Sequence, residues 1–480
     1  MQSSKPHAAL LSSPGMGHLI PVLQLGKLLV TQHNFTVTIF VVASHTSGGE
    51  WEVLRSSMTS PFCDIVELPP VDISGLIHPG AAVVTVISVM MRESKPALRS
   101  AISAMKLPPT LLIDDLFGTE SLEIANELGI PKYVYMASNA WFLALTLYVP
   151  TLDKLVEGEY VEQTESFRVP GCRPVKPEVV VDPMLDRTDQ QYSEYLRIGI
   201  EFPKADGILV NTWEELQPQA LAALRDVKLL GGLAKNHPIY PVGPLTRPVG
   251  SPSSRTNKQL FGWLEKQPHE SVLFVSFGSG GTLSYEQMNE VAWGIELSQQ
   301  RFVWVVRTPT VTNRDAAFFT SGTGADDDGP SNYLPEGFVD RTREMGLLVP
   351  VWAPQVDILS HPSVGGFLSH CGWNSTLESI TNGVPMITWP LYAEQRMNAT
   401  LLREELGVAV GPEALPSKKL VGRDEIAKLV RKIMVDEEGF GIRAKVKELK
   451  RSAEKALSKG DSSHRALSLF AEVCEVQQNA

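Results

Sequence analysis

The chain has 480 residues, which is too long for a single hydrophobic core, so we expect two domains. Its hydrophobic content of 43% and charged content of 20% are typical of a globular enzyme. The formal net charge of -11 argues against a nucleic-acid-binding surface, and it implies that an anionic ligand would be held by local dipoles.

The four cysteines lie far apart and follow neither a metal-binding nor a disulfide pattern, so we expect free thiols in a reducing compartment. No signal peptide is indicated, because Pro14 and Gly15 interrupt the apolar segment at the N-terminus. The longest apolar stretch, around residues 140–149, is too short to span a bilayer. We therefore expect a cytoplasmic protein without a membrane span.

The chain opens with the β-α-β pattern of a doubly wound sheet. His18 ends the loop after the first expected strand, where ligands of such sheets bind. Gly15 and Gly17 do not continue into a dinucleotide fingerprint, because its third glycine would fall at Ile20. The expected elements are a strand at 7–13, a loop at 14–18, a helix from about 19 to 31 and a strand at 37–42.

Alternation of strands and helices continues through the first half of the chain. The helix expected at 140–148 is apolar nearly all round, which suits either a buried core helix or a helix that lines a pocket. The segment 159–194 is rich in proline and charge, and we expect a loop with a later helix. Strands are predicted at 110–113, 132–136 and 207–211, with a helix at about 118–128.

A linker is indicated at 241–257, and the alternation restarts after it. The region 308–335 is expected to be a surface loop, and the aspartates at 326–328 within it to be solvated residues and not a metal site. The remaining predictions are a strand at 271–277, a glycine loop at 278–281, a helix at 284–299, a strand at 302–307 and helices within 423–476.

The segment 352–395 is the most informative part of the sequence. A turn at Gly372 before a helix start would expose backbone N–H groups and the positive end of a helix dipole, which bind anions. Asn374 and Ser375 are types that cap helices, Trp352 offers a flat face to a base, and Glu378 can accept from ribose hydroxyls. Strands are predicted at 346–351, 364–369 and 386–388, and a helix at about 376–381.

This segment runs from WAPQ through HCGWNS to a final EQ, and it resembles the signature of plant family 1 glycosyltransferases, which use UDP-sugars. The chain from SPGMGHLIP onward is similar to the phenol and hydroquinone (arbutin-synthase-like) glucosyltransferases of that family. The resemblance implies an α/β fold of GT-B architecture, with two doubly wound Rossmann-like domains that face a cleft. It implies an acceptor-binding domain at 1–245, a UDP-sugar-binding domain at 246–458 and a C-terminal helix at 459–480 that packs on the first domain.

The resemblance also implies the donor contacts. A final glutamine in the signature is associated with glucose, so UDP-glucose is the expected donor, and neither a metal nor another cofactor is expected. Zinc at His370 and Cys371 is unsupported, because further ligands at a usable spacing are missing. The implied contacts are Trp352 and Ala353 for uracil, Gln355 and Glu378 for ribose, Ser279, His370, Asn374 and Ser375 for the diphosphate, and Trp373, Glu394 and Gln395 for the hexose.

Glycosyl transfer needs a base for the acceptor hydroxyl, a stabilised diphosphate and a dry site. His18 is the candidate base, since imidazole titrates near neutrality. The resemblance pairs it with the aspartate before an LFG-like turn, which is Asp115, and the neighbouring Asp114 is the alternative. Inversion at an α-linked UDP-glucose would give a β-D-glucoside.

Candidate acceptor contacts are Leu116, Phe117, Trp141 and Tyr392, and each of them is as well explained as a core residue. A small, flat, apolar pocket would suit a phenol, a hydroquinone or an indoxyl-like aryl hydroxyl. We expect a monomer that binds UDP-glucose and such an acceptor.

Two other functions are open. One is a nucleotide-dependent oxidoreductase, although the loop at Gly278 and Gly280 lacks its third glycine, which would fall at Leu283. The other is a non-catalytic nucleotide-sugar binding protein, for which replacement of His18 would change nothing beyond stability.

Overall fold

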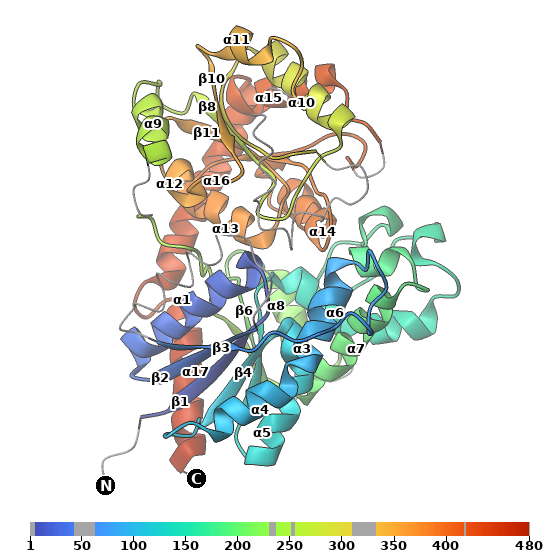
Figure 1. Cartoon of the computed structure of the whole chain (residues 1–480), viewed down its shortest axis with the longest axis vertical. Coiled ribbons are helices and arrows are strands. Elements are labelled where there is room, and N and C mark those ends of the chain that lie inside the picture. The colour runs from blue at the N-terminus through green and yellow to red at the C-terminus, as the bar shows by residue number, and fades with distance from the viewer. Residues whose placement is uncertain are drawn as a thin grey trace. The chain divides into compact units, whose positions relative to one another are not determined.

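The computed structural model describes residues 5–42, 63–229, 237–250, 255–309, 333–416 and 419–479, without the side chains of 255–257, 478 and 479 (Figure 1). The chain folds as two compact units. Unit 1 comprises Met1–Thr246 and Ser452–Ala480, and unit 2 comprises Arg247–Arg451. Each contains a parallel sheet flanked by helices, which confirms the predicted fold of two doubly wound α/β units.

The sheet of unit 1 has the order β3-β2-β1-β4-β5-β6-β7, and its strands pair in parallel. The order reverses between β1 and β4. The chain segments that follow these two neighbouring strands therefore leave the sheet in opposite directions. The strands are β1 (His7–Ser12), β2 (Thr36–Val42), β3 (Asp64–Leu68), β4 (Leu111–Asp115), β5 (Lys132–Met136), β6 (Gly207–Val210) and β7 (Ile239–Pro241).

Helices cover this sheet, and none within the described residues of the chain is long and apolar enough to cross a membrane. Those of unit 1 are α1 (Met16–His33), α3 (Val83–Glu93), α4 (Lys95–Ser103), α5 (Leu122–Leu128), α6 (Ala140–Leu155), α7 (Gln190–Glu201), α8 (Pro218–Arg225) and α17 (Ser462–Asn479). Short 3₁₀ turns are η1 (Leu116–Ser121), η2 (Tyr160–Glu162), η3 (Pro177–Val179), η4 (Asp182–Leu185) and η5 (Phe202–Lys204).

One face of the unit 1 sheet packs against α1 and α17. Alternate strand residues such as Leu111 and Ile113 point to this face, as the two-residue period of a strand requires. From α17, the ring of Phe470 packs edge-on against Tyr133 at 4.8 Å between ring centroids and against Tyr240 at 5.5 Å. The last helix of the chain is therefore part of the core of unit 1.

Unit 2 has the sheet order β10-β9-β8-β11-β12-β13, again parallel, and it reverses between β8 and β11. Its strands are β8 (Val272–Ser276), β9 (Arg301–Val306), β10 (Gly346–Pro350), β11 (Val364–Ser369), β12 (Met386–Thr388) and β13 (Ala409–Val410). Its helices are α9 (Arg255–Leu264), α10 (Tyr285–Ser298), α11 (Phe338–Thr342), α12 (Gln355–Leu359), α13 (Trp373–Asn382), α14 (Gln395–Thr400) with the π turn η8 (Leu401–Glu405), α15 (Arg423–Met434) and α16 (Glu437–Leu457), which runs past the boundary at 451.

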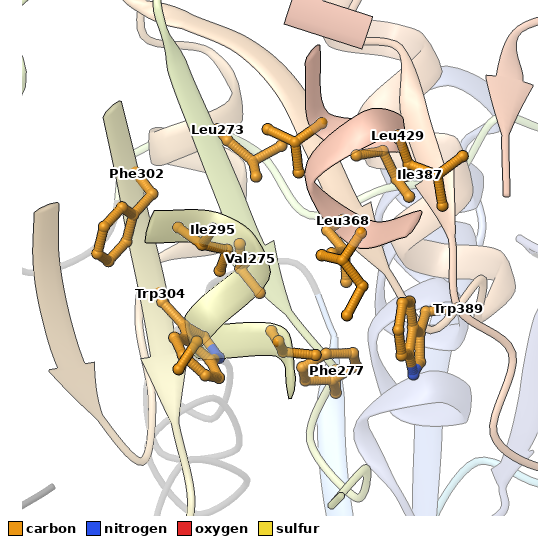
Figure 2. Packing of buried hydrophobic residues seen from close by; sticks show 14 of the residues in the cluster. Leu273, Val275, Phe277, Ile295, Phe302, Trp304, Leu368, Ile387, Trp389 and Leu429 are labelled. Atoms are coloured by element: carbon orange, nitrogen blue, oxygen red, sulfur yellow. The ribbon is translucent and has the colours of Figure 1, made fainter. Parts of the chain in front are cut away.

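The core of unit 2 lies between its sheet and the helices α10 and α15 (Figure 2). Leu273 and Val275 of β8 face Ile295 of α10, while Ile387 of β12 lies beside Leu429 of α15. The indole rings of Trp304 and Trp389 are buried in the same core. This packing fixes the positions of β8, which precedes Ser279, and of β11, which precedes His370.

Several predicted boundaries differ from the structure. α1 begins at Met16 and not at 19, so His18 lies in the first turn of a helix and not on a loop. Likewise α13 begins at Trp373 and not at 376. In both cases a glycine, Gly15 or Gly372, completes the turn within one residue, and the helix starts directly after it. Asn374 and Ser375 therefore lie inside the first turn and do not cap the helix.

Elements that were not predicted from the sequence are β3, α3, α4, α8, β7, α9 and the short α11, α12 and β13, and α6 extends beyond its predicted end at 148. The predicted loop at 159–194 holds three 3₁₀ turns before α7 begins at Gln190. The aspartates at 326–328 lie outside the described residues, as do residues 251–254 of the predicted linker.

Replacement of Phe470 by alanine should destabilise unit 1, because the ring fills a buried space between Tyr133 and Tyr240. We expect a loss of about 3–5 kcal/mol in the free energy of unfolding, as is typical for large-to-small changes at buried aromatic residues. Urea denaturation followed by tyrosine and tryptophan fluorescence measures it. The adjacent Leu469 is 53% exposed, so Leu469→Ala is the matched control and should change stability little; equal effects of the two changes would contradict the assigned packing.

Candidate functional site

The first group of candidate residues lies where β1 and β4 diverge in unit 1. Asp115 is the last residue of β4, and His18 is the third residue of α1, which follows β1. The Nδ1 atom of His18 lies 2.8 Å from the Oδ2 atom of Asp115. The Asp115 side chain is fully buried, whereas 17% of the His18 side chain is exposed. The structure thus brings these two predicted residues together at the edge where doubly wound sheets bind ligands.

The alternation of side chains along β4 separates Asp115 from Asp114. Asp115 shares a sheet face with Leu111 and Ile113, which pack against α1, so it can reach His18. Asp114 points to the other face, where a Cβ atom on Gly118 would lie 3.3 Å from both the Asp114 Cβ and the Met91 Cε of α3. Burial raises the pKa of Asp114 well above its usual value, and the charge of Asp115 adds to this effect. Asp114 is therefore a buried acid near α3 whose protonated form is favoured by its surroundings.

The arrangement of His18 suits proton acceptance. If Nδ1–H points at the Asp115 carboxylate, the Nε2 atom keeps its lone pair and faces away from the carboxylate. The ring of Phe117 packs edge-on against the imidazole, with centroids 5.3 Å apart. A carboxylate at Nδ1 stabilises the imidazolium that forms when Nε2 takes a proton.

The second group lies where β8 and β11 diverge in unit 2. His370 follows β11 directly, and its imidazole lies between two glycines. A Cβ atom on Gly278, in the loop after β8, would lie 2.5 Å from His370 Nε2, and a Cβ on Gly372 would also lie 2.5 Å from it. Gly278 also has a φ of +78°, in the left-handed region. Only glycine at both positions leaves room for the ring.

His370 is buried, and burial lowers its pKa to about 4, with a further contribution from the charge of Arg307. The imidazole is therefore neutral at neutral pH, with one N–H to donate. This is consistent with a hydrogen-bonding role toward an anion and not with general acid–base catalysis by His370.

The start of α13 lies directly beyond His370. Its N-cap residue Gly372 provides no side-chain hydrogen bond, and no acidic residue lies in its first turn. The first backbone N–H groups and the positive end of the helix dipole are therefore not neutralised by a local carboxylate. Cys371, at φ +65°, makes the turn, and Asn374 and Ser375 lie in the first helical turn. Such a helix start is suited to bind phosphate.

Gln355, Ser375 and Glu378 form a hydrogen-bonded set at one side of α13. The Gln355 Nε2 atom donates to Ser375 Oγ at 2.8 Å and to Glu378 Oε2 at 2.7 Å. Burial raises the pKa of Glu378 to about 7, although the Gln355 amide and Arg247 act in the opposite direction. The structure therefore groups both predicted ribose contacts with a predicted phosphate contact.

The predicted hexose contacts begin α14. Glu394 is its N-cap residue, and the Oε1 atom of Gln395 accepts hydrogen bonds from the backbone N–H groups of Leu391 at 2.8 Å and Tyr392 at 3.0 Å. The amide group of Gln395 is thereby oriented, and its NH₂ is left to donate elsewhere. Asn398 donates to the backbone oxygen of Cys371 at 2.9 Å and to Glu394 Oε1 at 3.2 Å. Sequence reasoning missed Asn398, which connects the turn before α13 with α14.

The remaining predicted residues differ in exposure. Trp352 is 37% exposed and follows Val351, whose φ is +62°, so its ring is available to a ligand. Ala353 and Trp373 are buried, as are the acceptor candidates Leu116 and Trp141. Phe117 and Tyr392 are partly buried. Ser279 lies in the loop between β8 and α10. Within the described ranges, no group of three or more His, Cys, Asp or Glu side chains is placed to hold a metal ion.

Both sheets thus have the reversal of strand order at which doubly wound sheets bind ligands, and in unit 2 the predicted donor contacts His370, Asn374 and Ser375 lie at it. Residues 253–422 match the family model described as UDP-glucoronosyl and UDP-glucosyl transferase. Anthocyanidin 3-O-glucosyltransferase 5 of Manihot esculenta is 65% identical over 466 residues, which cover 97% of this chain and 95% of that protein. The chain belongs to the plant family 1 UDP-glycosyltransferases and transfers a sugar from a UDP-sugar to an acceptor.

Solved structures agree. The crystal structure of TcCGT1 in complex with UDP is 49% identical, with a TM-score of 0.92 and coverage of 99% of this chain and 100% of that one. A UDP-glucosyltransferase from Polygonum tinctorium capable of glucosylating indoxyl, solved with 3,4-dichloroaniline, is 40% identical, with a TM-score of 0.87 and coverage of 99% and 100%. The GT-B architecture follows from these matches, and the oxidoreductase alternative is wrong.

A methyl group at Gly278 should impair donor binding, because it would displace the imidazole of His370 and strain the backbone. We expect Gly278→Ala to weaken UDP binding by about tenfold or more, the cost of losing one hydrogen bond to a charged group. Isothermal titration calorimetry measures it. Gly262→Ala in α9, where nothing lies within 4 Å of the added methyl, is the control and should bind UDP normally. Wild-type affinity in Gly278→Ala would count against the role of His370.

Glu378 should make stability depend on pH. Its pKa in the folded protein is about 7, above its usual value of 4.5, so the folded state retains a proton that the unfolded state releases in this window. The resulting stabilisation is complete below about pH 4.5 and is lost as the pH rises through 7. Glu378→Gln cannot ionise, so it does not lose this stabilisation. The melting temperature of Glu378→Gln minus that of the wild type should therefore increase as the pH rises from 5 to 8. A difference that stays constant across this range would contradict the assignment.

Proposed function

We propose that this UDP-glycosyltransferase transfers glucose from UDP-glucose to the hydroxyl of a small aromatic acceptor, with inversion, to give a β-D-glucoside. The single observation that carries the proposal is the pair of His18 and Asp115 at 2.8 Å. In the proposed mechanism, Nε2 of His18 removes the acceptor proton while the acceptor oxygen attacks the anomeric carbon and the bond to the diphosphate breaks. Because a phenol has a pKa of about 10, its deprotonation accompanies the attack.

Unit 2 supplies the donor site in this proposal. Trp352 and Ala353 contact the uracil, Gln355 and Glu378 hold the ribose, and Trp373, Glu394 and Gln395 hold the hexose. The negative charge on the departing diphosphate is stabilised by Ser279, by neutral His370 and by the start of α13 with Asn374 and Ser375. We propose that these groups suffice without a metal or another cofactor.

Unit 1 supplies the acceptor site in this proposal, with Leu116, Phe117 and Trp141 as contacts, and the acceptor contact of Tyr392 stays a prediction. Support comes from the contact of Phe117 with the His18 ring, which places an apolar surface beside the proposed base. The names of two relatives add support, since one acts on anthocyanidins and another on indoxyl, both of which are aromatic. A phenol, a hydroquinone or an indoxyl-like hydroxyl is the proposed acceptor. The monomeric state and the cytoplasmic location stay predictions.

The proposal is tested by glucosyl transfer from UDP-glucose to a panel of phenol, hydroquinone, indoxyl and an aromatic amine. We expect β-glucosides from the wild type, with the anomeric configuration read by NMR, and a loss of about 10²–10⁴-fold in kcat for His18→Ala. Asp115→Asn should also lose most of its activity, because the imidazolium is no longer stabilised. Asp114→Asn, one residue earlier and on the other sheet face, is the matched control and should retain kcat.

The outcomes separate the alternatives. Equal activity of wild type and His18→Ala would remove the base from the mechanism. If the wild type binds UDP-glucose but glucosylates none of the acceptors, the proposed acceptor class is wrong.

A further inference from the structure

Arg307 directly follows β9 and connects two loops of unit 2. Its Nε atom donates to the backbone oxygen of Val351 at 3.0 Å, and its Nη1 atom donates to the backbone oxygen of Ser279. Ser279 lies in the loop after β8, whereas Val351 directly precedes Trp352 and follows β10. Because β9 lies between β8 and β10 in the sheet, one guanidinium spans the two loops on either side of its own strand.

The conformation of Val351 makes this contact informative. Its φ of +62° lies in the left-handed region, which is unfavourable for a β-branched residue and persists only where the surroundings hold it. The hydrogen bond from Arg307 to the Val351 oxygen acts on this turn directly. The position of this turn determines where the exposed ring of Trp352 lies.

The charge of Arg307 is also unusual for its surroundings. Burial lowers its pKa, and within the part of the chain that the structure describes no carboxylate pairs with it. Its charge contributes to the low pKa of His370, so the guanidinium lies close enough to affect that ring. A partly buried cation is costly to keep, and an anionic ligand nearby would compensate it.

We infer that Arg307 is a positioning residue of the donor site, which holds the Ser279 loop and the Val351–Trp352 turn at the spacing that lets one UDP molecule contact both. The inference rests on the proposed function for the roles of Ser279 and Trp352. The planar guanidinium is required because it directs N–H groups at two carbonyls at once, whereas a lysine ammonium on a flexible stem reaches one of them.

The test compares Arg307→Met, Arg307→Lys and the control Arg301→Met, which lies at the exposed opposite end of β9. Dissociation constants for UDP are measured by calorimetry, and KM for UDP-glucose, KM for the acceptor and kcat are measured by initial rates. We expect Arg307→Met to raise the UDP dissociation constant and the donor KM by about tenfold or more, as loss of hydrogen bonds from a charged group implies. The acceptor KM and the kcat at saturating donor should stay within about threefold of wild type, a margin well below that effect.

Arg307→Lys distinguishes a clamp from a simple charge. We expect it to remain impaired for UDP, although it keeps the charge. Full recovery in Arg307→Lys, wild-type donor binding in Arg307→Met, or a parallel loss of donor and acceptor affinity would each overturn the inference. Melting temperatures establish that the variants are folded, and if Arg307→Met is not, the donor KM of Arg307→Lys decides. Failure of the wild type to bind UDP would instead refute the proposed function.

Discussion

The reversal of strand order in each sheet is the constraint on which the candidate sites depend. In a parallel sheet, connections leave neighbouring strands in the same direction until the order reverses, and there two carboxyl ends lie side by side with their helices on opposite courses. In unit 1 this occurs between β1 and β4, and in unit 2 between β8 and β11. His18 and Asp115 meet at the first reversal, and His370 lies against the Gly278 loop at the second.

The electrostatics of unit 2 suit the proposed binding of an anionic donor by an acidic protein. The net charge of -11 gives no general attraction, so the local groups matter. They are backbone N–H groups at a helix start, a neutral imidazole and one guanidinium that already donates to two carbonyls. Fixed dipoles of this kind need little reorganisation when charge develops on the leaving diphosphate, which is the property that electrostatic catalysis requires.

Much of this arrangement is readable from the sequence, and the exceptions have physical causes. The strands β5, β11 and β12 were predicted with their observed bounds, because short apolar runs end there at glycine, proline or polar residues. β3 was missed because its sequence, DIVEL, carries charges on an edge strand, and α3 because its β-branched run resembles a strand. The choice of Asp115 over Asp114 follows from strand alternation once the end of β4 is known. Arg307 and Asn398 act through backbone oxygens, which leave no sequence motif.

The packing of His370 between two glycines also has an evolutionary consequence. Positions 278, 370 and 372 are sterically coupled, since a side chain at either glycine would overlap the imidazole. A side chain at position 372 is harmful while His370 is present, but it becomes acceptable once a smaller residue replaces His370. Position 278 has a second requirement, because its positive φ favours glycine whatever residue stands at 370. The order in which such changes can accumulate is therefore restricted. Of the two residues 370 and 372, position 370 has to change first.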